Sequence, residues 1–598
     1  ILTKNEKMFN TFKVKKPQRS TFSLSHKHET TVNIGDINML HWNWCFPGDR
    51  FKIRYSFLVK FAPMIAPNFS RMRVKSEVFY VPLSDLYDHF HDTLMNYKEV
   101  SSTVVENGTQ STVSFTKFPY IRSNALAWWL KQTPSVYDGS SETYFDAIGK
   151  QTVMQQYAVS RLVHQVGVPF DLTQKKIYNA GASPYLVDNP YYNSKYTDGD
   201  FSGNNVTYSP AGQVPISLFP FQAYQYVYNW FYRDSVRTEE VDCYPDVFSI
   251  PSGSSGSNNM LRSFFDAYIN SNSAYYDDWA VNYPARLVPA NRFINSLFQI
   301  RRRFYRKDYF NTAVGDPTVG VDSIQVPSNI VDLRKANQLQ KFIEKQALAG
   351  NRIAEFIMAH WAYKSDDYEL GRPILISTSS QNVQISEVLQ TSQTTDGESG
   401  SAQGTRSGNA NSYGNSNGSY FVSPDYGILL INMSILPEIS YFSGTPRKLT
   451  PYRWEHFAWP EFAQIGMQPI YEFELGTKNY SPWTSPAALE DFPVFGYAPR
   501  YSEYKMELDQ VSGEMATSLR YWHQSPAFAS APNLNENFGL IGFRDYNSFH
   551  SRQQIDEFFY FNQIFAVQDD RIADHAQVIG LFDISVNRAL PYNDMPAL

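Results

Sequence analysis

The densest group of side chains that could do chemistry is both basic and aromatic. It is the run Arg301-Arg302-Arg303-Phe304-Tyr305-Arg306-Lys307. Guanidinium groups pair with phosphates and aromatic rings stack on bases, so such a run suits single-stranded nucleic acid. A protein interface or a buried ion-pair cluster explains the same residues equally well. Arg301, Arg302 and Arg303 are therefore candidates for either role.

A second basic group lies in the first 20 residues. Its cations face a single acid, Glu6, and are Lys4, Lys7, Lys13, Lys15, Lys16 and Arg19. Local positive charge favours contact with a polyanion. The pattern predicts a basic N-terminal arm over residues 1–20 that binds DNA, with a disordered, solvated tail as the alternative. The net charge of the whole chain, −6, adds no support for a nucleic-acid partner.

Residues that could catalyse a reaction or hold a metal are poorly placed for either role. The pairs His26/His28 and His89/His91 could each share one face of a strand, but no third Cys or His follows at ligand spacing. There is no phosphate-binding glycine loop, dinucleotide fingerprint or nucleophile elbow. Two cysteines are too few for a disulfide framework. We therefore predict no catalytic residue, no metal site and no cofactor, as expected for a protein that is not an enzyme.

Alternation of apolar and polar residues predicts several strands. The clearest is Phe51–Phe61, in which the odd positions are apolar. Arg71–Val81 and Val578–Val586 show the same two-residue period, and Tyr471–Leu475 alternates aromatic or aliphatic residues with glutamates. Tyr426–Leu436 is apolar almost throughout, which is typical of a strand buried on both faces.

Helical spacing of apolar residues predicts helices at Phe219–Asp234 and Val331–Trp361, the second broken or kinked at Gly350. Long polar stretches separate the elements. Gly397–Tyr420, rich in Gly, Ser and Asn, is interpreted as a mobile surface loop, and Pro190–Ser209 likewise. Short strands, few strand–helix alternations and long insertions predict a mainly β fold, an elaborated antiparallel sandwich or jelly roll, in a single domain spanning residues 1–598.

Several short segments follow one another in an order typical of one family. They are Ser23–His26, Pro47–Phe51, Phe79–Pro82, Phe219–Asp234, Lys307–Ala313, Phe495–Lys505 and Arg588–Leu598. Together, across nearly the whole chain, they resemble the major capsid proteins of microvirus-type single-stranded-DNA bacteriophages, especially the gokushovirus-like branch. The sequence departs from that pattern at Trp230, where the family usually has Glu, and at Val314–Pro317, where it usually has Leu-Pro-Trp-Pro.

The resemblance implies an eight-stranded viral jelly roll with large loop and helical insertions. Copies of it would assemble into a T=1 icosahedral shell around a circular single-stranded DNA genome. The implied partners are identical capsid subunits, the genome, other virion proteins and a host surface receptor, with no membrane insertion. The protein would be assembled in the host cytoplasm and reside in the virion.

Two further expectations follow. The length and polarity of the segments 397–420 and 190–209 make one or the other a candidate for an exposed loop that contributes to host attachment. The strands at Phe51–Phe61 and Val578–Val586 should pair, because the first and last strands of a jelly roll are neighbours.

Two other classes of protein fit part of the sequence. An aromatic content of 16% suits a glycan-binding protein whose rings stack on sugars, although such proteins are usually exported and no signal segment is apparent. A β-sandwich glycoside hydrolase would need two carboxylates facing each other across a cleft.

Overall fold

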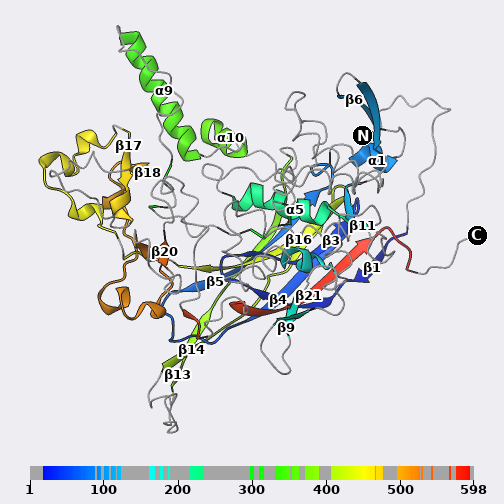
Figure 1. The fold of residues 1–598 in the computed structure, drawn as a ribbon. Helices are drawn as coiled ribbons and strands as arrows, with labels where there is room; N and C mark the ends of the chain where they lie inside the picture. The colour runs from blue at the N-terminus through cyan, green and yellow to red at the C-terminus, as the bar shows by residue number, and fades with distance from the viewer. Residues whose placement is uncertain are drawn as a thin grey trace, which may run out of the picture.

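Two facing antiparallel sheets form the centre of the computed structural model (Figure 1). The structure describes most of residues 18–122, 330–389, 406–475 and 494–529, the stretch 574–592, and short pieces between 161 and 314 and between 540 and 566. The predicted loop 190–209 lies outside these residues. The fold is mainly β, as predicted, and both large sheets are antiparallel.

The larger sheet has seven strands among the described residues. They are β1 (Ser20–Ser23), β2 (His26–Val32), β4 (Arg50–Phe61), β13 (Gln384–Leu389), β14 (Arg406–Asn415), β15 (Ser419–Val422) and β21 (Ala576–Arg588). β1 and β2 both pair with β21, β21 pairs with β4, and β14 and β15 both pair with β4. Strands from the N-terminal and C-terminal parts of the described chain therefore lie in one sheet.

Within the part of the chain that the structure describes, the smaller sheet has four strands in the order β12-β5-β16-β3. They are β3 (Ile37–Cys45), β5 (Met72–Pro82), β12 (Ile374–Asn382) and β16 (Gly427–Pro437). Ten of the eleven residues of β16 are buried, which confirms the prediction of a strand covered on both faces.

The main core lies between the two sheets. Alternate residues of β4, including Phe51, Ile53 and Phe57, are buried against residues such as Tyr80 and Ile431 from the smaller sheet. Burying one large apolar side chain completely stabilises a fold by about 1.5–3 kcal/mol. The alternation seen in the sequence is thus the pattern of one strand face that packs inward.

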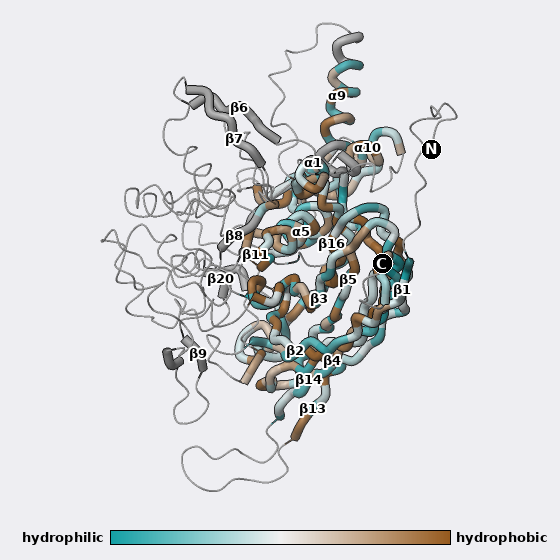
Figure 2. The backbone as a smooth tube through the Cα atoms, turned by 90° about the vertical axis from the view of Figure 1, so that its right-hand side faces the viewer, coloured by the Kyte–Doolittle hydropathy of each residue, from teal (hydrophilic) through white to brown (hydrophobic). Residues whose placement is uncertain are grey.

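A helical layer covers the other face of the smaller sheet. Helix α5 (Phe219–Val227) continues as a π-helix over Tyr228–Tyr232, so the predicted helix at Phe219–Asp234 is confirmed to Tyr232. Phe221 and Tyr224 pack with Ile37 and Phe79 in a second core. Figure 2 shows the order of layers: α5 above, then β3, β5 and β16, then β2, β4 and β14.

Two helices project from this layered body at the top of Figure 1. They are α9 (Ile330–Ala349) and α10 (Ile353–Trp361), which confirms the predicted helix and its interruption around Gly350. A shorter helix, α1, covers Phe90–Met95. None of the described helices is both long enough and apolar enough to cross a membrane.

The remaining described strands form two-stranded pairs. These are β6 (Val100–Glu106) with β7 (Thr109–Phe115), β8 (Tyr120–Arg122) with β11 (Pro215–Ser217), β9 (Lys176–Tyr178) with β10 (Leu186–Asp188), β17 (Met467–Tyr471) with β18 (Val494–Pro499), and β19 (Ala527–Ala529) with β20 (Leu540–Gly542).

The predicted pairing of the first and last strong strands is confirmed. β4 and β21 run antiparallel along twelve paired positions, from Ala576 opposite Phe61 to Asn587 opposite Arg50. The strand predicted at Arg71–Val81 is confirmed as β5.

The prediction of a loop at Gly397–Tyr420 is wrong for the residues of this segment that the structure describes. Residues 406–415 form β14 and residues 419–422 form β15. The inward positions of β14 are small, Gly408, Ala410 and Ser412, so no apolar alternation marks the strand in the sequence. A β-carbon added at Gly408 would lie 2.6 Å from the carbonyl oxygen of Ala66, which shows why that position must be small.

The prediction of a strand from the alternation at Tyr471–Leu475 is also wrong. β17 ends at Tyr471, and Glu472–Glu474 form a 3₁₀ turn. The turn lets the backbone N–H of Tyr471 donate to the Glu474 carboxylate (3.0 Å), a local bond that a continuing strand would not allow.

Candidate association surfaces and a candidate pocket

The predicted DNA-binding residues Arg301 and Arg303 lie against the core layers. Their backbone is bonded to the turn before β3: Arg303 N–H donates to Gly35 O and Ile37 N–H to Arg301 O, both at 2.8 Å. The Arg301 Nε donates to Gln225 Oε1 of α5 (2.8 Å). The segment therefore joins helix and sheet.

Arg303 makes a nearly buried ion pair with Glu77 of β5. Its Nη1 and Nη2 donate to the two carboxylate oxygens at 2.8 and 3.2 Å, and Tyr232 donates to Glu77 as well (2.6 Å). Burial raises the pKa of Glu77, but Arg303, Lys75 and Tyr232 more than offset this, so its pKa is lowered. For Arg303 the geometry favours the ion-pair interpretation. Arg302 lies outside the described residues, and DNA binding by this run stays a prediction.

The N-terminal arm is described only from residue 18 onward. Lys4, Lys7, Lys13, Lys15 and Lys16 lie outside the described part, so DNA binding by these lysines also stays a prediction. Arg19 is described, and its Nη1 donates to the carbonyl oxygen of Gly48 at 2.6 Å. This bond fixes where the arm joins the larger sheet.

Two of the segments recognised in the sequence contact each other directly. Arg588, at the end of β21, donates from Nε to Asp49 Oδ2 at 2.8 Å, and Asp49 is almost completely buried. The same carboxylate oxygen accepts the backbone N–H of Phe46 (3.1 Å), and Arg588 also donates to Trp44 O. The Pro-Gly-Asp turn and the C-terminal segment thus form one structural unit.

A surface of exposed aromatic and aliphatic side chains follows β16. We call it the aromatic ridge, and its members are Leu449, Tyr452, Trp454, Phe457, Trp459 and Phe462. Leu449 is 75% exposed and Trp454 is 61% exposed. Six large apolar side chains exposed within 14 residues far exceed the scattered exposure of ordinary surfaces. Such surfaces are typical of protein–protein contacts.

Short turns hold the aromatic ridge in place. It contains the 3₁₀ turns Trp454–His456 and Pro460–Phe462. The Trp459 indole N–H donates to Trp454 O (2.9 Å), and the Trp459 backbone N–H donates to the hydroxyl of Tyr501 (3.2 Å). Because the backbone is tied down, the exposed rings can bind a partner with a smaller loss of conformational entropy.

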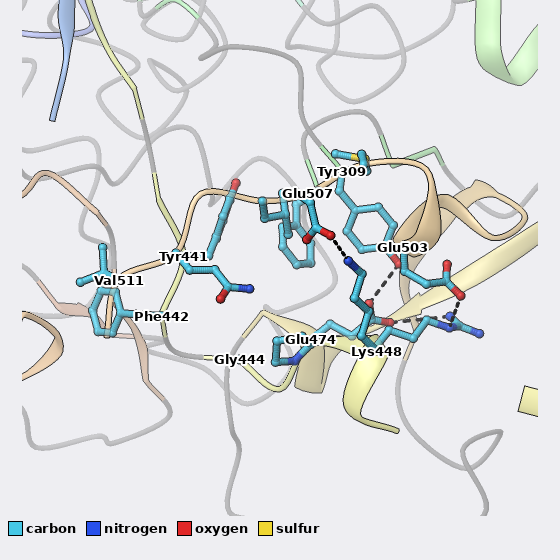
Figure 3. A pocket seen from close by; sticks show the side chains of 15 residues that line it. Tyr309, Tyr441, Phe442, Gly444, Lys448, Glu474, Glu503, Glu507 and Val511 are labelled. Atoms are coloured by element: carbon cyan, nitrogen blue, oxygen red, sulfur yellow. Dashed lines mark hydrogen bonds and ion pairs between the residues drawn. The ribbon is translucent and has the colours of Figure 1, made fainter. Parts of the chain in front are cut away.

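A pocket of about 180 Å³ lies beside the start of the aromatic ridge (Figure 3). Rings and aliphatic side chains form its apolar wall: Tyr309, Phe310, Tyr441, Phe442, Met506, Leu508 and Val511. Its charged residues are Arg447, Lys448, Glu474, Glu503 and Glu507.

The pocket carboxylates are bonded to the protein itself. Glu474 accepts from the Tyr309 hydroxyl and the Tyr471 N–H, both at 3.0 Å, and Arg447 lies 3.7 Å away. Burial raises the pKa of Glu474 to about 6 against the opposing effect of these partners. Glu507 pairs with Lys448 (Figure 3). Bonded in this way, the acids stabilise the pocket wall, and their arrangement does not resemble an acid–base pair poised over a substrate.

Two of the histidines singled out in the sequence, His26 and His28, lie near a third that was not predicted, His41. His41 of β3 lies with its ring centroid 4.7 Å from that of His26 and 5.3 Å from that of Phe582. Burial, with smaller contributions from His26 and His28, lowers the pKa of His41 to about 3. Among the described residues no group of three or more His, Cys, Asp or Glu side chains is arranged to hold a metal ion.

The sequence contains a signal for the aromatic ridge that strand and helix periodicity does not capture. Three Trp or Tyr residues occur between 452 and 459 without strand or helix periodicity. Aromatic residues that fit neither period are candidates for a surface contact. His41 had no comparable signal, because its neighbours come from β2 and β21.

The chain matches known proteins over most of its length. A model of the family described as Capsid protein (F protein) matches residues 10–114 and 306–580, more than half of the chain. A protein named Capsid protein VP1 from Chlamydia phage 1 is 25% identical over 576 residues, covering 87% of this chain and 89% of that protein.

Two further relatives carry the same name. Capsid protein VP1 of Bdellovibrio phage phiMH2K is 23% identical over 539 residues, covering 87% of each chain. Capsid protein VP1 of Spiroplasma virus 4 is 26% identical over 223 residues, covering 35% of this chain and 37% of that protein. The first range matched by the family model includes β4 and β5, and the second includes β12, β14 and β16.

Proposed function

The chain belongs to the phage Capsid protein (F protein) family, and from this premise we propose that it is the major shell subunit of a T=1 icosahedral virion. Its role as a structural capsid protein follows from the family. We further propose that the shell encloses a circular single-stranded DNA genome and that the subunit is assembled in the host cytoplasm. Because the chain belongs to a capsid family, we favour the capsid role over the glycan-binding and glycoside-hydrolase alternatives.

The proposed architecture is an elaborated viral jelly roll of eight strands in one domain. The observation that carries it is the pairing of strands from the two matched ranges within both sheets: β4 with β14, and β5 with β12 and β16. Two collinear pairs, β1 with β2 and β14 with β15, each lie along one long strand. If each collinear pair is counted as one strand, the number of strands in the two sheets comes closer to the eight of the proposed jelly roll.

Self-association is the activity that such a subunit needs. A closed shell uses several different patches, each of which meets a copy of the same chain. The aromatic ridge supports this proposal, because aromatic side chains held by a rigid backbone are typical anchors of interfaces. Other virion proteins and a host receptor are the further proposed partners, with 190–209 and 397–405 as candidate segments for host attachment.

Electron microscopy of the purified full-length protein tests the proposal. Uniform small shells are expected, together with a sedimentation coefficient far above that of a 68.7 kDa monomer. Dispersed monomers over a wide range of concentration and salt would contradict self-assembly by this chain alone. Nuclease-protected DNA of one length inside purified shells would support the proposed genome packaging.

A further inference from the structure

One face of strand β4 carries a row of cations. Arg50, Lys52, Arg54 and Lys60 are exposed, and the residues that alternate with them are buried in the main core. We call this row and its neighbours on adjacent strands the basic strand face. In Figure 2, β4 and β14 lie in the layer farthest from α5, so this face points away from the smaller sheet.

Few acids balance these cations. Asp583 lies opposite Arg54 in the register, and its Oδ1 accepts from the Ser25 hydroxyl at 3.2 Å. Two other acids of the sheet are already paired: Glu29 with Lys27, and Glu387 with Arg406. Among the described residues, no ion pair is formed by any of the four β4 cations. The face therefore keeps an excess of positive charge.

Two exposed tyrosines stand next to this row. Tyr420 of β15 is opposite Lys52 and 64% exposed, and Tyr413 of β14 is opposite Leu58 and 65% exposed. Directly paired residues of adjacent strands point to the same face. Lys52 and Leu58 are roughly 20 Å apart along β4 at about 3.3 Å per residue. The two rings are thus separated by the span of several nucleotides.

Neutral side chains between the charges can also form hydrogen bonds. Asn411 is opposite Lys60, and Asn415 is opposite Ser56. An amide both donates and accepts, so it can bind base edges or phosphates without strong sequence preference. At the other end of the face, Asn587 lies between Arg50 and Thr21 of β1, the strand into which the basic arm leads.

We propose that the basic strand face is a binding site for single-stranded DNA. Phosphates pair with Arg50, Lys52, Arg54 and Lys60, and bases stack on Tyr413 and Tyr420. The identity of the DNA as a packaged genome rests on the proposed function, whereas the site itself rests on this charge and geometry.

The chemistry of the face favours this occupant over others. A second copy meeting the same face would bring like charges together, which is unfavourable. A duplex keeps its bases stacked on one another, so it could not use the exposed rings. Single strands satisfy both features, because they offer phosphates and unstacked bases together.

Two double variants of the full-length protein separate the contributions of charge and stacking. Binding of a fluorescent 20-nucleotide oligo(dT) is measured by anisotropy over a range of salt. Lys52→Gln with Lys60→Gln should weaken binding at least tenfold and reduce the salt slope by about 1.4, at roughly 0.7 per phosphate contact. Tyr413→Ser with Tyr420→Ser should weaken binding roughly tenfold or more and leave the slope unchanged.

The matched control removes two exposed lysines elsewhere. Lys335→Gln with Lys341→Gln, on α9, carries the same charge change and should bind oligo(dT) within about twofold of the original chain. Equal losses in this control and in the β4 variant would overturn the proposal, since general charge would then explain binding. Wild-type affinity in the β4 variant would also overturn it. Unchanged thermal unfolding shows that each variant is folded.

Shell formation is scored separately by electron microscopy. If the β4 variant loses oligo(dT) binding and shells still form, the proposed site is supported. The same loss of binding in a protein that forms no shells also supports the site. The absence of shells would then count against the proposed function. Loss of shells with unchanged oligo(dT) binding would assign the face to subunit contacts and overturn the proposal.

Discussion

At the scale of single residues, the charged side chains of the core regions are held by specific partners. Glu77 and Arg303 are joined by two hydrogen bonds across 226 positions of sequence, and Asp49 and Arg588 by one across 539. Removing one partner of such a pair leaves a buried charge uncompensated, which is costly. His41 is different, because it is half-buried and its lowered pKa favours the neutral form.

His41 makes the folded chain sensitive to acid. Its pKa is about 3 when folded and about 6.5 when unfolded, so below pH 6.5 the unfolded chain takes up a proton that the folded chain does not. Stability should therefore fall as the pH drops from 6.5 towards 3, by roughly 2–4 kcal/mol after allowing for partial exposure. His41→Gln should flatten this slope in unfolding midpoints measured from pH 7 to 4.

His91→Gln provides the control for this measurement. His91 is exposed and pairs with Asp425 at 3.0 Å, so its removal should not flatten the acid slope. An unchanged slope in His41→Gln would show that His41 does not carry the acid sensitivity.

At the scale of elements, the strands differ in how visible they are in the sequence. β4, β5, β16 and β21 were predictable, because large apolar side chains mark their buried positions. β14 was not, because its buried positions are Gly, Ala and Ser. A strand packed against a nearby backbone must use small residues there, and these carry no hydropathy signal.

Gly408 is the position at which this close packing can be tested. A side chain there would meet the carbonyl of Ala66 at 2.6 Å and Met64 at 3.0 Å. Gly408→Val should lower the free energy of unfolding by roughly 1–3 kcal/mol, the usual cost of overpacking. Asn409→Val, at the exposed neighbouring position, should change it by less than about 0.5 kcal/mol. If denaturant titrations showed that both variants lower the free energy of unfolding equally, close packing would not be what restricts position 408 of β14 to a small residue.

At the scale of the whole molecule, function depends on surfaces that the monomer leaves uncovered. The aromatic ridge and the basic strand face differ in chemistry, one apolar and the other cationic. An apolar surface suits contact with another protein, whereas a cationic one suits nucleic acid. A shell subunit needs surfaces of both kinds.

The aromatic ridge should contribute to association between copies. Trp454→Ser with Leu449→Ser removes two of its most exposed side chains and should raise the concentration needed for assembly at least tenfold, since aromatic anchors dominate interface energies. Light scattering during assembly measures this threshold. Tyr592→Ser, an exposed ring near the end of the described chain, is the control and should leave the threshold within about twofold. If the ridge variant assembled at an unchanged threshold concentration, the aromatic ridge would not be part of the contacts between shell subunits.

The sequence by itself determined the mainly β class, the strong strands, the interrupted helix and, through ordered motifs, the capsid family. The strands and the helix are local features, because each is expressed in the spacing of neighbouring residues, and the family is expressed in the order of short segments along the chain. Only the tertiary structure decided that Arg303 pairs with Glu77, that a Gly- and Ser-rich segment is a strand, and that Lys52 lies beside Tyr420. Such contacts depend on strand register and on residues hundreds of positions apart, which no local pattern encodes.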